Sequence, residues 1–134
     1  MTSPGRIDIR HTRAFIISGL AAGHGVMHWF NRSLQLMLPE VQDTFRLSEI
    51  GVGGISATRE LASGLVTLPG GLAVDVFRRH WGLILAMAMG GFGVGWLVMG
   101  VSPVYPVLIL GIAIVSLTSS IWHLPATAAL SRRF

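Results

Sequence analysis

The chain has 134 residues, of which 51% are hydrophobic and only 12% are charged. Because soluble domains carry about 25% charged residues, this composition argues against an ordinary soluble domain and predicts membrane spans. The chain has no cysteine, so disulfides and thiolate metal sites are excluded. Its net charge of +4 comes from arginines that flank apolar runs, which is a topology signal and not the pattern of a nucleic-acid interface.

Apolar segments at about residues 14–38, 49–74, 81–101 and 104–124 predict four transmembrane helices within residues 14–130. Helices of this length rise about 1.5 Å per residue and can cross about 30 Å of hydrocarbon. Residues 1–13 are expected to form a polar cytoplasmic segment, residues 39–47 a polar connection and residues 131–134 a second cytoplasmic end. Ser48 is a candidate N-cap of the second helix. The sequence therefore predicts an all-α integral membrane protein.

The distribution of arginine predicts how these helices are oriented. The arginines on one side are Arg6, Arg10, Arg13, Arg78, Arg79, Arg132 and Arg133. Only Arg46 and Arg32 are candidates for the other side. Since short cytoplasmic loops carry an excess of Lys and Arg, we expect a multi-pass protein of the inner or plasma membrane with both termini in the cytoplasm.

The third segment contains small residues at the spacing that allows helices to pack closely in lipid. Gly91 and Gly95 form a GxxxG pair, and Ala86 and Gly90 repeat its spacing. The segment has no charged residue, so it offers nothing polar to an internal cavity. We therefore expect the third helix to lie at the lipid-facing periphery.

Arg59 and Glu60 lie about ten residues into the second segment, close to the expected bilayer midplane. Each charge there costs about 2.5 to 3.5 kcal/mol, so this helix needs polar neighbours or a water-filled cavity. The pair is a candidate substrate or proton site. An interhelical ion pair with a purely structural role is the alternative.

The first segment carries a polar stripe on an otherwise apolar helix. His24, His28 and Arg32 follow each other at intervals of four residues, with Asn31 and Gln35 beside them. Such a stripe suits a helix that lines an aqueous pathway, in which histidine can relay protons. Hydrogen bonding between helices is the alternative. The HxxxH spacing also suits a metal, but no third ligand is evident, and we expect neither a metal nor a cofactor.

The fourth segment has polar residues in its second half. They are Ser116, Thr118, Ser119, Ser120 and His123. Serine and threonine in such helices often bond their own backbone, so His123 is the stronger candidate for a substrate or proton pathway. No nucleophile with a neighbouring base and no phosphate-binding loop is recognisable, and we do not expect an enzyme.

Residues 69–81 read PGGLAVDVFRRHW and place an acid and a basic cluster between two apolar segments. This loop resembles the motif G-x-L-a-D-R-x-G-R-R of major facilitator superfamily transporters. Gly71 matches the first glycine, Asp75 the acid, and Arg79 with His80 the closing basic pair. Val76 and Arg78 depart from the motif. The segment 123–130 before the final SRRF also resembles fosmidomycin-resistance-type exporters.

The resemblance implies that the chain is the first third of the family's twelve-helix fold and hence a partial protein. It implies secondary transport of a small organic solute or drug, with protons as a candidate coupling ion and with the remaining helices or another copy as partners. Gly71, Asp75, Arg78 and Arg79 would then form a gating loop. One alternative is a complete four-helix multidrug exporter that acts as a dimer, although such exporters need an acid in the first helix. Another is a membrane subunit without transport activity.

Overall fold

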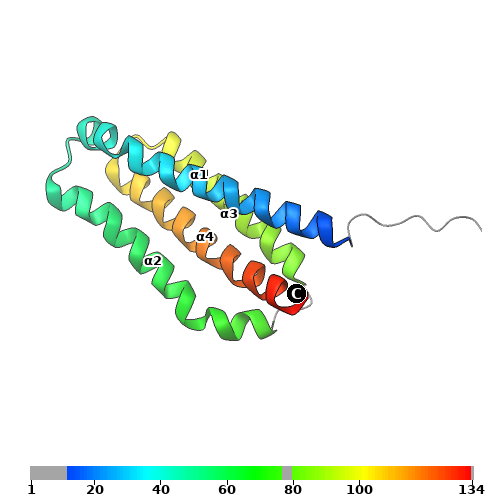
Figure 1. Cartoon of the computed structure of the whole chain (residues 1–134). Coiled ribbons are helices and arrows are strands. Elements are labelled where there is room, and N and C mark those ends of the chain that lie inside the picture. The colour runs from blue at the N-terminus through cyan, green and yellow to red at the C-terminus, as the bar shows by residue number, and fades with distance from the viewer. Residues whose placement is uncertain (1–11, 77–79, 134) are drawn as a thin grey trace, which may run out of the picture. The chain divides into compact units, whose positions relative to one another are not determined.

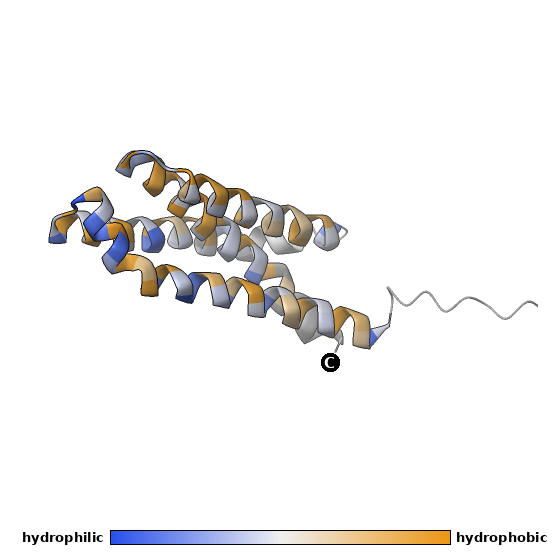
Figure 2. Ribbon diagram, turned by 90° about the horizontal axis from the view of Figure 1, so that it is seen from above, coloured by the Kyte–Doolittle hydropathy of each residue, from blue (hydrophilic) through white to orange (hydrophobic). Residues whose placement is uncertain are grey.

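The computed structural model describes residues 12–76 and 80–133 and has α-helices but no strand in those residues. In chain order the helices are α1 (Arg13–Phe45), α2 (Glu49–Val76), α3 (Trp81–Gly100) and α4 (Tyr105–Arg133) (Figure 1). The expected all-helical fold is therefore confirmed. Strongly hydrophilic residues are confined to a few turns of these helices, and hydrophobic residues recur along their length (Figure 2).

Two of the helices are long and apolar enough to cross a membrane. They are α3, over Trp81–Gly100, and the part of α4 over Tyr105–Leu124. The other two expected spans do not reach this level of hydrophobicity within the described residues. The charged and polar residues inside α1 and α2, together with their glycines, account for the difference.

The helix α1 extends beyond Leu38, although the polar composition of residues 39–47 predicts its end there. It passes through Pro39 and ends at Phe45. Because proline has no N–H, the carbonyl of Gln35 loses its partner four residues further on. The chain divides into two compact units, Met1–Gln35 and Leu36–Phe134, so the boundary between them directly follows Gln35. The missing hydrogen bond weakens α1 at this turn.

The C-terminus of α1 is closed by a Schellman motif. The N–H of Leu47 donates to the carbonyl of Gln42 at 2.9 Å, and the N–H of Arg46 donates to that of Asp43 at 3.2 Å. Arg46 occupies the left-handed position with φ of 50°, where glycine is the usual residue. The next helix then begins at once, because the Ser48 hydroxyl accepts the N–H of Gly51 at 3.3 Å. The expected N-cap is thus confirmed.

Arg46→Gly is expected to stabilise the chain by about 1 kcal/mol, because a side chain costs about 1 to 2 kcal/mol in the left-handed region. Chemical unfolding followed by circular dichroism measures the change. Arg46→Ala is the matched control, since it removes the charge but keeps the Cβ atom. An equal gain from alanine would show that the charge of Arg46, and not its backbone conformation, is the source of the destabilisation.

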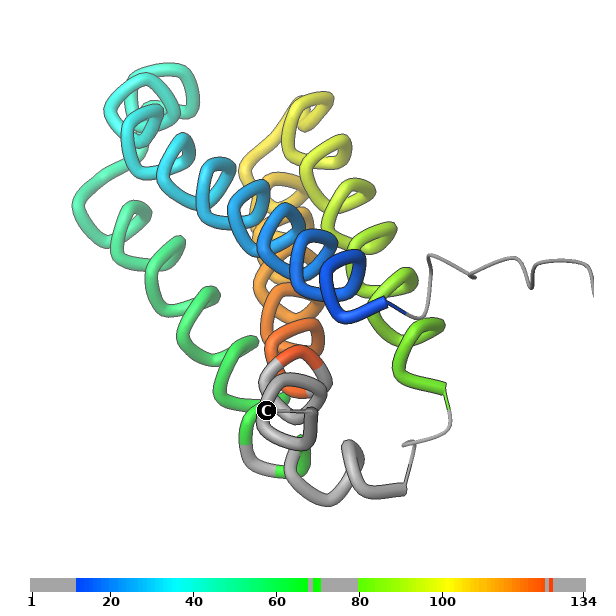
Figure 3. The backbone as a smooth tube through the Cα atoms, turned by 45° about the vertical axis from the view of Figure 1, so that its right-hand side comes forward, coloured from blue at the N-terminus to red at the C-terminus, as the bar shows by residue number. Residues whose placement is uncertain are grey.

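In the unit Leu36–Phe134, α4 contacts both α2 and α3. Figure 3 shows α4, in orange, between α2 in green and α3 in yellow-green. The contact with α3 is the closer one. A Cβ atom built on Gly95 would lie 2.9 Å from the backbone nitrogen of Val115, and one built on Gly111 would lie 2.9 Å from that of Met99. The two backbones therefore approach closely, and close packing through Gly91 and Gly95 is confirmed. The prediction was wrong for Ala86 and Gly90, which are both exposed on the other face of the helix.

The buried and exposed residues of α3 separate cleanly onto two faces. Ala88, Phe92, Gly95 and Met99 are buried, at the spacing of one helical stripe. The large exposed residues of α3 and the residue after it are Leu83, Met87, Val94, Leu97 and Val101. None of them is polar. An exposed stripe without polar residues is typical of a helix that faces lipid or another apolar surface.

Candidate functional site

Arg59 and Glu60 lie in the middle of α2 and point in different directions. Arg59 is half-buried and belongs to the same stripe as the buried residues Ile55 and Ala62, while Glu60 is exposed. This divergence follows from helix geometry, since neighbouring residues are about 100° apart. The two side chains therefore lie in different surroundings. Arg59 is at the edge of the packed face of α2, and Glu60 is on its exposed face.

No ion pair or side-chain hydrogen bond joins Arg59 or Glu60 to another residue whose side chain the structure describes. A charge in an apolar helix is retained at a cost, and that cost is normally offset by a partner, by water or by a ligand. The structural ion pair that the sequence allowed is thus absent among the described residues. The other hypothesis, that these charges act on a substrate or a proton, is consistent with this absence.

Two polar contacts that sequence reasoning missed connect α2 with α4. The hydroxyl of Tyr105 donates to the carbonyl of Gly51 at 2.7 Å, and the hydroxyl of Ser120 donates to that of Ser63 at 2.9 Å. Tyr105 is the only tyrosine of the chain and begins α4 directly after a turn. A lone tyrosine at a helix end, with a polar tip and an apolar ring, is the signal that could have predicted the first contact.

Other hydroxyl groups of these helices bond their own backbone. Thr58 donates to the carbonyl of Gly54 at 2.8 Å, Thr67 to that of Ser63 at 2.9 Å, and Thr118 to that of Ile114 at 2.7 Å. This local bonding was the alternative interpretation of the polar residues of α4, and it holds for Thr118. Ser120 is different, because its hydroxyl reaches the neighbouring helix.

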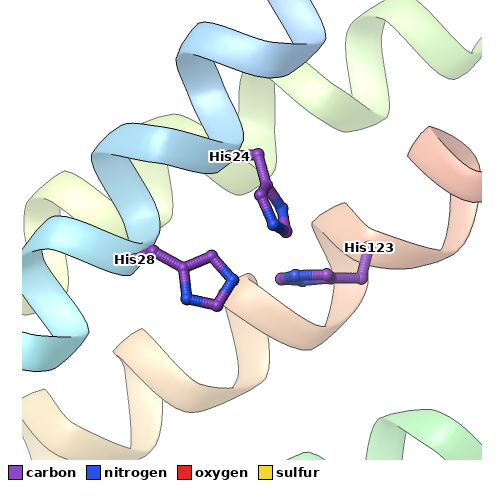
Figure 4. A group of neighbouring side chains, drawn as sticks. All are labelled: His24, His28 and His123. Carbon is purple, nitrogen blue, oxygen red and sulfur yellow. The ribbon is translucent and has the colours of Figure 1, made fainter.

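His123 lies half-buried on α4 (Figure 4) and is held by its own helix. Its Nδ1 is 2.7 Å from the carbonyl oxygen of Ser119, a distance that requires this nitrogen to carry the proton and donate it. The ring also meets that of Trp122 edge-on, with centroids 5.3 Å apart. Nε2 of His123 is then the nitrogen that can accept a proton.

In the unit Met1–Gln35, the polar stripe of α1 forms as expected. His24 and His28 are both exposed, and their ring centroids are 4.3 Å apart with the planes at 61° (Figure 4). Further along the stripe, the Arg32 guanidinium donates to Oε1 of Gln35 at 3.0 Å. This bond directs the Arg32 charge toward the C-terminal end of the stripe and away from the two imidazoles.

The loop motif is covered only in part. Gly71 and Asp75 belong to the last turns of α2, but their surroundings and the side chain of Asp75 lie outside the described part of the structure. Arg78 and Arg79 also lie outside the described residues. His80 precedes α3 as its N-cap residue and makes no side-chain capping bond there. The gating role of this loop therefore remains a prediction.

No protein-family model, no curated protein and no solved structure matches the chain. Two features stand out: charges inside α2 that have no ion-pair partner among the described side chains, and two neighbouring imidazoles on α1.

Proposed function

We propose that this chain is a membrane-spanning part of a secondary transporter of the major facilitator type, which carries a small organic solute or drug. In this proposal all four helices cross the inner or plasma membrane and both termini are cytoplasmic. The exposed apolar stripe of α3 supports a lipid-facing helix. The loop motif around Asp75 supports the transporter family.

The proposal rests mainly on the surroundings of Arg59 and Glu60, two charged residues in the middle of α2. Neither side chain has an ion-pair partner among the side chains that the structure describes, and Glu60 is exposed in the middle of an otherwise largely apolar helix. In hydrocarbon each charge costs about 2.5 to 3.5 kcal/mol. An aqueous pathway removes most of this cost, because water and a polar solute then solvate the carboxylate. Further helices of the transporter or a second copy would close that pathway.

Glu60→Gln is expected to reduce transport roughly tenfold or more, equivalent to about 1.4 kcal/mol of lost interaction with the solute or proton. The protein should reach the membrane in nearly normal amounts, since amide and carboxyl have almost the same shape. Ethidium accumulation and survival in fosmidomycin, both measured in cells that express the protein, report transport of an organic cation and an organic anion. Immunoblots of membrane fractions report abundance.

Glu49→Gln provides the matched control, because it makes the same chemical change on the same helix, at its exposed first turn. This variant should behave like the unmodified protein in both assays. A loss of membrane abundance with Glu60→Gln alone would assign Glu60 a structural role in contact with a partner. Unchanged transport of a substrate that the protein does carry would contradict the proposal for this residue.

A further inference from the structure

The pair His24 and His28 offers a second kind of chemistry that does not depend on transport. Both side chains come from one continuous helix and lie on the same face, because residues four apart are stacked one turn above the other. Their ring centroids are 4.3 Å apart. In a neutral imidazole one ring nitrogen carries a lone pair, so two such rings can present two nitrogen ligands to one ion.

The separation of the rings suits chelation. Zinc binds imidazole nitrogen at about 2.0 to 2.1 Å, so two nitrogens on one ion lie no more than about 4.2 Å apart. Rings whose centroids are 4.3 Å apart bring their nitrogens into this range by small rotations about the side-chain torsions. Paired histidines at i and i+4 on a helix are an established arrangement for zinc.

The backbone next to His24 is not crowded, and the charge of Arg32 is directed away from the pair. His24 lies between Gly23 and Gly25, and a Cβ atom built on Gly25 would meet nothing within 4 Å. The one cation on the same stripe is Arg32, whose guanidinium is bonded to Gln35 in the direction away from His28. Both imidazoles are exposed, so water can occupy the remaining coordination positions where the polar stripe of α1 borders an aqueous pathway.

We propose that His24 and His28 form a two-histidine chelate for a divalent transition-metal ion. Imidazole ligands suit Zn²⁺, Cu²⁺ and Ni²⁺, whereas Mg²⁺ and Ca²⁺ require oxygen ligands. The second imidazole acts at a high effective concentration, since the helix holds it beside the first. This fixed spacing gives the pair an affinity that a single exposed histidine lacks.

The test is a titration of the whole purified chain, without any histidine tag and in detergent micelles, with Zn²⁺ against a chromogenic competitor. His24→Ala and His28→Ala are each expected to weaken Zn²⁺ binding about tenfold or more, the effect of ~1.4 kcal/mol. Mg²⁺ should not compete. Alanine favours helix more than histidine does, so both variants should keep their helix content, which circular dichroism checks.

Two controls separate chelation from general attraction to histidine. The double variant His28→Ala with Val26→His keeps the number of histidines but moves one to a different face of α1. It should bind Zn²⁺ as weakly as His28→Ala. His80→Ala removes a histidine that has no other histidine within four residues, and it should bind like the unmodified chain.

Electron paramagnetic resonance of the Cu²⁺-loaded chain is an independent test, because it reports how many imidazole nitrogens bind the ion. Coupling to at least two imidazole nitrogens is expected, and it should fall in both single alanine variants. The proposal is overturned if only one nitrogen couples, if neither alanine variant weakens Zn²⁺ binding, or if moving the histidine to position 26 leaves the affinity unchanged.

Discussion

Val94→Arg is expected to lower the amount of protein in the membrane about tenfold or more, because it places a charge on the exposed apolar stripe of α3, which faces lipid in the proposed function. Val94 is 53% exposed and lies inside the apolar helix Trp81–Gly100. An arginine at the centre of a span costs about 2.5 to 3.5 kcal/mol on the insertion scale, and ~1.4 kcal/mol already corresponds to a factor of ten. Fractionation of cells followed by immunoblotting measures the effect.

The size of this effect depends on the solvent around α3. In water, substituting an exposed residue changes stability by about 0.5 kcal/mol or less, so the same variant would be harmless. Val101→Arg is the matched control, because Val101 is 76% exposed but follows the end of the helix. There an arginine can reach the membrane surface, and abundance should be unchanged. Normal abundance of both variants would contradict a lipid-facing α3.

Gly95→Ala is expected to destabilise the packing of α3 against α4 by about 2 kcal/mol, within the range known for overpacked cores. The new Cβ atom would lie 2.7 Å from Cγ2 of Val115, 2.9 Å from its backbone nitrogen and 3.1 Å from the carbonyl oxygen of Gly111. A side-chain methyl can rotate away, but the two backbone atoms cannot. The helices must therefore separate. Thermal unfolding in detergent micelles, followed by circular dichroism, reports the loss.

Gly93→Ala makes the same substitution two residues earlier, where a Cβ atom meets nothing within 4 Å. Alanine is favoured over glycine in a helix by about 0.8 to 1 kcal/mol, so this variant should be at least as stable as the unmodified chain. The two alanine variants should therefore differ by about 3 kcal/mol. If they unfold alike, the close approach of α3 and α4 at Gly95 does not contribute to stability.

Sequence reasoning alone determined the helical class of the protein and most of its helix boundaries. The start of α3 at Trp81, the N-cap Ser48 and the packing glycine Gly95 follow from local rules: apolar run length, capping chemistry and small-residue spacing. The polar stripe of α1 was also predictable, because residues four apart share a face whatever the helix packs against. Each of these features depends on residues close together in the chain.

Only the tertiary structure decided the features that depend on distant residues. The contacts of Tyr105 with Gly51 and of Ser120 with Ser63 join residues 54 and 57 positions apart, and no local pattern specifies such a pairing. The course of α1 through Pro39 was likewise unexpected, because proline weakens a helix and only the closure at Arg46 shows where α1 ends. The different exposure of Arg59 and Glu60 belongs here too, since a sequence shows that two neighbouring charges point in different directions but not which of them is half-buried.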